Sequence, residues 1–166
     1  YTLLQESEKR LDNDAILSSI ISENKKVILP LYFTISPTPP REEQKMADYL
    51  LKNSIPLSGS THFLMARDIT PPIASFASHA LGLGHINVVP NTDGTVRSEP
   101  LLINYANRLF PSFALQLVLK YLNYDVKDIV ASQNITTIRN IRIPTYDKNT
   151  MLISFNKKLE FSIYSF

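Results

Sequence analysis

Side chains able to hold a metal ion are few and scattered in this sequence. Its three histidines, His62, His79 and His85, include no pair with the i, i+4 spacing of a helical zinc site, and no acidic residue completes a metal-binding pattern with them. Structural or surface roles are therefore the better interpretation of all three. Because the chain has no cysteine, disulfides, thiol catalysis and cysteine-ligated metals are excluded.

Nucleophilic and phosphate-binding chemistry also lacks a recognisable pattern. Ser58 and Ser60 flank Gly59 without the remaining residues of a nucleophile elbow, and no partner base is indicated by their spacing. The four glycines of the chain form no phosphate-cradling loop. We therefore predict that this chain has no catalytic activity, no cofactor and no metal centre.

Polar residues inside strand-like apolar runs are the more informative feature. The stretch 84–103, GHINVVPNTDGTVRSEPLLI, consists of two such runs around the sequence Asn-Thr-Asp-Gly. Asn91 suits the first position and Gly94 the fourth position of a type I turn, with Gly94 in the left-handed conformation of a three-residue hairpin loop. The stretch thus predicts a long β-hairpin around Asn91–Gly94.

The register of this hairpin decides which faces its polar residues occupy. The three-residue loop places Asn91 opposite Thr95, Val89 opposite Arg97 and Asn87 opposite Glu99. A two-residue loop would instead place Arg97 and Glu99 among the apolar side chains of Ile86 and Val88, which is unfavourable for charged groups. The sequence therefore favours the longer loop, with Asn87, Arg97 and Glu99 on one face.

Two interpretations of these polar residues remain open at this level. The first is a polar cluster that pins the two strands together, which is the favoured one because ion pairs also mark structural sites. The second is a ligand cradle in which the forked guanidinium of Arg97 holds a carboxylate. The candidate ligand-binding or structural residues are Asn87, Asp93, Arg97 and Glu99.

The elements that must position these residues alternate between helix and strand. A helix over 13–24 is predicted from the N-cap that Asp12-Asn13-Asp14 offers and from a stripe of Ile16, Leu17, Ile20 and Ile21. The continuous apolar run 27–33 predicts an interior strand that is covered on both faces. A second helix is expected over 42–52, with Met46, Tyr49 and Leu50 on one side, and residues 63–66 are a further candidate strand.

The second half of the chain gives a similar alternation. We expect a helix that begins near Pro71 or Pro72 and ends at Gly82 or Gly84, and strands over 135–143 and 151–155 separated by 146–149. A helix over 113–122 is predicted to bury Phe113, Ala114, Leu117, Val118, Tyr121 and Leu122. This order indicates an α/β fold, a layered mixed sheet with the helices over 13–24 and 113–122 packed on it.

Length and composition set the broad class. The chain has 166 residues, of which 44% are hydrophobic and 19% charged, as expected of one folded domain spanning 1–166. A net charge of +2 with scattered Lys and Arg argues against nucleic-acid binding. The longest apolar run is well short of the ~18 residues that a membrane span needs.

Three segments of the chain carry a recognisable combination of motifs: GHINVVPNTDGTVRSEPLLI, RLFPSFALQLVLKYL and IRIPTYDKNTMLISF, which cover about half of the chain. Together they resemble the type-two CHASE family of extracytoplasmic sensor domains. The residues that match the family pattern by position are Gly84, His85, Asn87, Pro90, Asp93, Gly94, Arg97, Pro100, Leu101, Pro111, Ser112, Ala114, Ile143, Pro144, Ile153 and Phe155.

Some positions depart from this pattern. Asn91 stands where the family usually has Asp, and Ser154 where it often has Asn. The strand–helix portion that normally precedes the helix over 13–24 is not recognisable, so we expect the chain to be a fragment that lacks it. An unpaired sheet edge in its place would favour self-association as a homodimer.

The resemblance implies a sensor outside the cytoplasmic membrane, in the periplasm or extracellular space. A membrane-anchored parent protein would carry a cytoplasmic adenylate or guanylate cyclase, histidine kinase or serine/threonine kinase, and the domain would bind an unknown small-molecule signal. Two alternatives stay open. A clustered Ser-His-Asp or a carboxylate pair would favour a small soluble α/β enzyme such as a hydrolase, and a dimer without any pocket would favour a structural dimerisation module.

Overall fold

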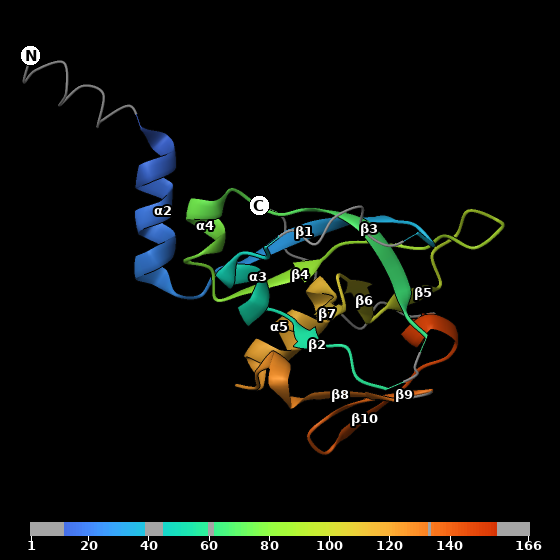
Figure 1. The fold of residues 1–166 in the computed structure, drawn as a ribbon. Helices are drawn as coiled ribbons and strands as arrows, with labels where there is room; N and C mark the ends of the chain where they lie inside the picture. Colours follow the sequence, from blue (N-terminus) through green and yellow to red (C-terminus); the bar gives the residue numbers. More distant parts are fainter. Residues whose placement is uncertain (1–11, 39–44, 60–61, 133, 156–166) are drawn as a thin grey trace, which may run out of the picture.

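The computed structural model describes residues 12–38, 45–59, 62–132 and 134–155 (Figure 1). Its helices are α2 (Asn13–Asn24), α3 (Asp48–Lys52), α4 (Ala74–Ala77) and α5 (Phe113–Tyr121), with 3-10 turns η1 (Val126–Asp128) and η2 (Asp147–Asn149). Its strands are β1 (Ile28–Ile35), β2 (Ile55–Pro56), β3 (Leu64–Thr70), β4 (Gly82–His85), β5 (Ser98–Pro100), β6 (Leu102–Tyr105), β7 (Arg108–Pro111), β8 (Ile129–Ser132), β9 (Ile135–Ile138), β10 (Ile141–Pro144) and β11 (Thr150–Leu152).

The principal sheet has six strands in the order β2-β7-β6-β3-β1-β4. The pairs β1–β4 and β3–β6 are parallel, and the other three neighbouring pairs are antiparallel. A smaller sheet has the order β10-β9-β8, and β5 pairs with β11 alone. The predicted α/β fold with a mixed sheet is confirmed.

The six-stranded sheet curls so that its edge strand β4 approaches β7. His85, at the end of β4, forms a parallel bridge with Ser112, the residue that follows β7. All four residues of β4 are buried, so this strand offers no free edge for another copy of the chain. The opposite edge, β2, has two residues, and one of them is Pro56, which has no N–H to donate. The six-stranded sheet therefore gives no long edge for the self-association predicted above.

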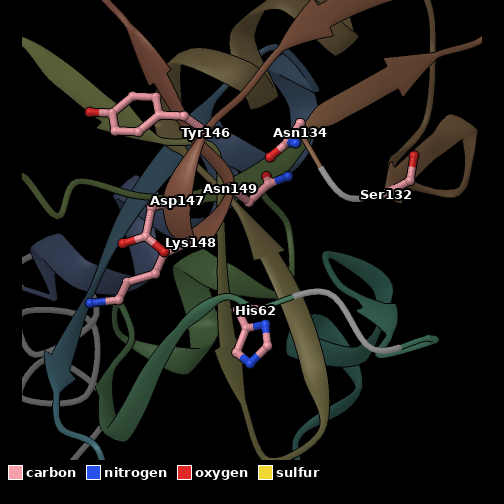
Figure 2. A pocket seen from close by; sticks show the side chains of 7 residues that line it. All are labelled: His62, Ser132, Asn134, Tyr146, Asp147, Lys148 and Asn149. Atoms are coloured by element: carbon pink, nitrogen blue, oxygen red, sulfur yellow. The ribbon is translucent and has the colours of Figure 1, made fainter.

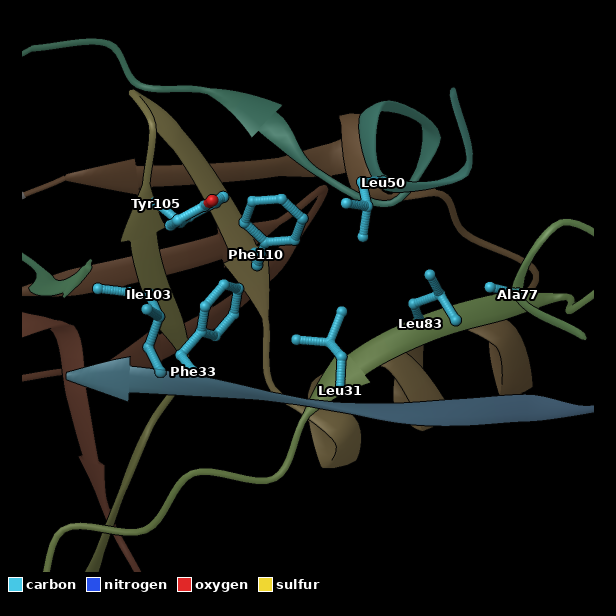
Figure 3. Packing of buried hydrophobic residues seen from close by; sticks show 9 residues of the cluster. Leu31, Phe33, Leu50, Ala77, Leu83, Ile103, Tyr105 and Phe110 are labelled. Atoms are coloured by element: carbon cyan, nitrogen blue, oxygen red, sulfur yellow. The ribbon is translucent and has the colours of Figure 1, made fainter. Parts of the chain in front are cut away.

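The interior of this curled sheet is the first of two hydrophobic cores. Phe33 lies at its centre, with ring centroids 5.2 Å from Phe110 and 5.7 Å from Tyr105, and Leu31 and Leu83 pack in the same cluster (Figure 3). Aromatic rings at these separations and tilts gain edge-to-face attraction in addition to apolar burial. This cluster fixes the curvature of the strands that surround it.

Strand β1 is interior, as predicted, but only one of its faces is covered. Leu31 and Phe33 are buried inside the curled sheet, whereas Tyr32 between them is 51% exposed. The prediction of burial on both faces was therefore wrong. A strand buries every residue of an apolar run only when both faces of its sheet are covered. In the described part of the chain, β1 is covered on its inner face, by the first core.

The second core lies between β6–β7, helix α5 and the small sheet. Leu102 and Leu109 point to it from the large sheet, Leu115 and Leu119 from α5, and Ile138 from β9. Helix α5 packs on β4 and β1, so the prediction that it lies on the sheet is confirmed.

The buried face predicted for α5 was wrong. The helix buries Leu115, Gln116 and Leu119, while Leu117 is 46%, Val118 43% and Tyr121 86% exposed. Apolar residues occur all around the sequence FALQLVLKYL, so its periodicity does not select a face. The helix begins at Ser112, whose hydroxyl accepts a hydrogen bond of 3.1 Å from the Leu115 N–H, and its packing on β4, β1 and the second core determines which face is buried.

Helix α2 begins at the predicted cap, where Asp12 accepts a hydrogen bond of 2.9 Å from the Ala15 N–H. It lies beside α4 at one end of the molecule rather than packing mainly on the sheet (Figure 1), contrary to expectation. Ile21 is buried, but Ile16, Leu17 and Ile20 are each nearly half exposed. A short link joins α2 to the start of β1, and the helix lies beyond that end of the strand (Figure 1).

Helix α3 confirms the predicted inward side, because Leu50 is buried and Met46 and Tyr49 pack against the first core. The first part of the predicted helix, residues 42–44, lies outside the described residues, and residues 45–47 are not helical, so the helix begins at Asp48 rather than near residue 42. The candidate strand at 63–66 is confirmed as the beginning of β3. Helix α4, in contrast, ends at Ala77, well before the expected glycines, which belong to β4.

The C-terminal segment also differs from the predicted pattern. Residues 135–143 do not form one strand, but a hairpin of β9 and β10 that turns at Arg139, whose backbone is left-handed with φ 51°. β11 occupies the start of the second predicted strand. The same apolar pattern continues on both sides of this turn, so the sequence did not indicate that the chain reverses direction there.

Candidate functional site

Asn87, the first of the predicted polar residues, is buried and holds a strand. Its side-chain oxygen accepts a hydrogen bond of 2.9 Å from the Phe33 N–H, and its amide nitrogen donates one of 2.7 Å to the Phe33 carbonyl. These two bonds are those that a neighbouring strand would make with β1. Both polar atoms of the Asn87 amide therefore bond to the backbone of β1, as the interpretation of a strand-pinning residue expects.

Asp93 and Arg97 form an exposed ion pair of 2.8 Å in the turn. Asp93 also accepts hydrogen bonds from the side chain and backbone of Thr95, and these bonds, with the contribution of Arg97, lower the pKa of the carboxyl group below its usual range. Both partners of the pair are about half exposed. This arrangement stabilises the turn locally and leaves the guanidinium outside any of the described cavities.

The turn itself forms as predicted. The Gly94 N–H donates to the Asn91 carbonyl at 2.9 Å, Gly94 has φ 78°, and the Asn91 N–H donates to the Thr95 carbonyl at 2.8 Å. The long hairpin around it, however, is absent from the described strand pairs. The Ile86 N–H instead donates to the Leu31 carbonyl, so the chain before the turn continues along β1.

Glu99 lies in β5 opposite Met151 of β11 and is partly exposed. Among the described residues, no hydrogen bond or ion pair joins Glu99 or Asn87 to Arg97 or Asp93. The predicted register for Asn87 and Glu99 was therefore wrong. Each side of the expected hairpin found a different partner, β1 for the first side and β11 for the second.

A serine–histidine contact tests the hydrolase alternative. Ser18 Oγ lies 3.3 Å from His79 Nδ1, but the same nitrogen is 2.8 Å from the Ser75 carbonyl oxygen, and Ser18 Oγ donates to that oxygen at 3.1 Å. Because a carbonyl oxygen only accepts hydrogen bonds, Nδ1 carries the proton in this arrangement and cannot take another from Ser18. The contact holds α2 to α4 and is not a nucleophile–base pair.

His85 is the most deeply buried titratable group of the matched motif. It is 1% exposed, its ring lies 6.2 Å from that of Phe33, and neither ring nitrogen has a hydrogen-bond partner among the described residues. Burial alone lowers the pKa of the imidazole to about 3. His85 is therefore neutral at physiological pH. The described residues contain no group of three or more His, Asp or Glu side chains that could hold a metal ion.

A small polar hollow lies between His62, which precedes β3, the ends of β8 and β9, and the turn around η2 (Figure 2). Its volume is about 110 Å³, and its lining residues are His62, Ser132, Asn134, Tyr146, Asp147, Lys148 and Asn149. The innermost of them, Asn149, exchanges hydrogen bonds of 2.8 and 3.1 Å with the Thr136 hydroxyl. The hollow is thus too small for most metabolites, and its deepest polar group is already paired.

Two larger hollows meet at Lys127. One of about 480 Å³ lies where α3, α4 and α5 end, and it is lined by three lysines and one aspartate together with apolar side chains. The other, of about 340 Å³, is an apolar groove between β2 and β8 that includes Ile55, Leu109 and Ile129. Sequence reasoning missed both, because their walls come from segments far apart in the chain.

The motif residues thus support the fold rather than form one reactive cluster. Gly84 and Ser112 lie where β4 meets the residue after β7, and Asn87 bonds to the neighbouring strand β1. A comparison with protein-family models matches residues 2–166 to the CHASE2 domain, so the chain belongs to the CHASE2 family of sensory extracytoplasmic domains of signalling proteins.

No curated protein and no solved structure matches the chain in the corresponding comparisons. Among the described residues, no helix combines the length and the apolar character that a membrane crossing requires.

Proposed function

We propose that this chain is the signal-sensing domain of a membrane-anchored bacterial protein. It lies in the periplasm or outside the cell, binds a small-molecule signal, and changes the activity of a cytoplasmic adenylate or guanylate cyclase, histidine kinase or serine/threonine kinase. The observation that carries the proposal is the match to the CHASE2 domain over residues 2–166. The absence of an activated nucleophile in the described residues supports a binding role rather than catalysis.

The location of the domain is tested in the full-length protein. The chain contains no cysteine, so a Thr92→Cys substitution at the exposed tip of the turn creates the only thiol in this domain. We expect a maleimide that cannot cross the cytoplasmic membrane to label this cysteine in cells whose cytoplasmic membrane is intact and whose outer envelope lets the reagent through. Labelling that requires lysis of the cytoplasmic membrane would contradict the proposal, and the unsubstituted protein is the control for thiols elsewhere in the parent.

The output of the parent protein needs a second measurement. Cyclic-nucleotide synthesis and autophosphorylation by the full-length protein distinguish a cyclase from a kinase. Loss of regulation, with basal output retained, is expected when the ligand site of the sensor is removed. An output that never responds to a change at this domain would favour the structural dimerisation module instead.

A homodimer is part of the same proposal. The described sheet edges do not favour it, but α2 presents Ile16, Leu17 and Ile20 nearly half exposed, and an apolar helix face can pack on a second copy. Sedimentation velocity of the chain at several concentrations measures its association. A single monomeric species at the highest concentration would remove the homodimer from the proposal.

A further inference from the structure

The hollow where α3, α4 and α5 end has the size and chemistry of a ligand site. Its volume of about 480 Å³ is within the range of small-molecule pockets. We propose that it binds a small organic acid, a carboxylate on a compact apolar body, and that it is the site at which the domain receives its signal. The role in signalling rests on the proposed function; the binding itself does not.

The lining of this hollow, called the lysine cleft below, carries an excess of positive charge. Lys52, Lys120 and Lys127 line it, and Asp125 is its only lining carboxylate. Lys120 Nζ lies 3.5 Å from Asp125 Oδ2, which leaves Lys52 and Lys127 without an ion pair among the described residues. Two uncompensated ammonium groups beside one cavity attract an anion and disfavour a cation.

The carbonyl groups at the end of α3 would ordinarily oppose an anion. In this structure Arg108 binds them from the other side: its Nη2 donates to the Leu51 carbonyl at 3.2 Å and to the Ser54 carbonyl at 2.9 Å, and its Nε donates to Ser54 Oγ at 2.7 Å. The guanidinium therefore offsets the negative end of α3. Lys120 lies in the last turn of α5 and pairs with Asp125, so Lys52 and Lys127 are the charges that remain for a ligand.

The rest of the lining is apolar or already fixed. Ala77, Ala80 and Leu81 form an apolar wall, which suits a hydrocarbon skeleton better than a fully hydrated ion. Asn53, which also lines the cleft, donates to the Tyr49 carbonyl at 2.8 Å and accepts hydrogen bonds from the Leu83 N–H and the Gln116 amide. This buried network holds the helix ends in place, so a ligand meets a preorganised site.

Binding is measured on the chain itself by titration with benzoate, followed in amide nitrogen–proton correlation spectra. We expect saturable shifts of the Asn53, Ser78 and Lys127 amide signals. Benzamide has the same shape without the charge, and inorganic phosphate has the charge without the apolar body. If the cleft recognises the carboxylate as well as the apolar ring, benzamide and phosphate should each bind at least about tenfold more weakly than benzoate. A tenfold loss corresponds to roughly one good polar or apolar contact.

Substitutions test the charges directly. Lys52→Ala and Lys127→Ala should each raise the dissociation constant of benzoate roughly two- to fivefold, the range for a partly exposed ion pair. Lys26→Ala removes the same charge from an exposed position that lines none of the three hollows, and should change nothing. Asp125→Asn retains an acceptor for the Lys127 N–H but removes the carboxylate, so it should tighten benzoate binding by a similar factor.

The increase expected for Asp125→Asn distinguishes a binding site from damage to the fold, since a misfolded variant does not bind more tightly. The proposal is overturned if benzoate gives no saturable shifts at tens of millimolar, if benzamide or phosphate binds as well as benzoate, or if the lysine and aspartate variants bind like the parent chain. Absent benzoate binding together with thiol labelling in intact cells would refute this site and leave the sensor function standing. Benzoate binding, together with thiol labelling that requires lysis, would support this site and refute the extracytoplasmic sensor function.

Discussion

The side chain of Asn87 takes the place of a β-strand beside Phe33. It accepts from the Phe33 N–H at 2.9 Å and donates to the Phe33 carbonyl at 2.7 Å, both buried. The parallel partner of β1 ends two residues earlier, at His85. Asn87 therefore satisfies the next pair of backbone groups along β1 after the ladder has stopped, and holds in place the residue at the centre of the first core.

Replacing Asn87 by Ala should destabilise the domain strongly. Both backbone groups of Phe33 would lose their partner in a buried environment, which costs about 1–3 kcal/mol for each group. We expect a loss of about 2–5 kcal/mol in the free energy of unfolding, measured by denaturant titration. Arg97→Ala is the matched control, because it removes an exposed polar side chain of the same motif, and should leave the denaturation midpoint unchanged. Equal midpoints for the two variants would contradict a structural role for Asn87.

His85 should make the domain sensitive to mild acid. In the unfolded chain its imidazole gains a proton near its usual pKa of 6.5, whereas the folded domain keeps the imidazole neutral down to about pH 3. The unfolded state therefore binds more protons between these values, and stability falls as the pH is lowered from 6.5 towards 3. The loss from this group amounts to about 2 kcal/mol at pH 5.

His85→Leu removes both the titration and the two unpartnered ring nitrogens. We expect this variant to be as stable as the parent at pH 7, or more stable, and to lose the part of the acid sensitivity that belongs to His85. His62→Leu, at an exposed position, is the control and should keep the full sensitivity. Denaturation midpoints at pH 7, 6 and 5 give the comparison. Parallel curves for His85→Leu and the parent chain would show that another group is responsible.

Gly84 is required by close approach of two segments. A Cβ atom at this position would lie 2.5 Å from Phe113 Cα and 2.9 Å from the Ser112 carbonyl oxygen, both of which are backbone atoms. Gly84→Ala must therefore separate β4 from the start of α5, at a cost on the order of 3 kcal/mol. At Gly82 the obstacle is the side chain of Gln116. Its amide would have to shift its hydrogen bond to Asn53, but no backbone has to move, so Gly82→Ala should cost less. The reverse order in thermal unfolding would contradict this explanation.

Local signals predicted the elements of the fold well. The cap at Asp12, the inward side of α3 and the turn at Gly94 depend on residues adjacent in sequence, and each is confirmed. The long hairpin failed because its register assumed that the two sides of the turn pair with each other. Instead β1 pairs with the first side and β11 with the second, and such long-range competition leaves no trace in a local pattern.

The candidate site was less predictable for the same reason. The sequence singled out Asn87, Asp93, Arg97 and Glu99 as polar residues in apolar runs, and the structure brings only Asp93 and Arg97 together. The cleft lined by Lys52, Lys120 and Lys127 was missed, because surface lysines are common and these come from three separate segments. Only the folded chain shows that they face one cavity.

The rotation of α5 gives the last prediction, which separates two residues of the same type two positions apart. Leu119 is fully buried in the second core, whereas Leu117 is 46% exposed. Leu119→Ala should lower the free energy of unfolding by about 2–5 kcal/mol, because it leaves a cavity between α5 and the sheets. Leu117→Ala removes the same atoms from a half-exposed position and should cost less than about 1 kcal/mol. Chemical denaturation of both variants measures the difference. A larger loss for Leu117→Ala would mean that the helix presents the opposite face to the core, the face that its sequence alone had favoured.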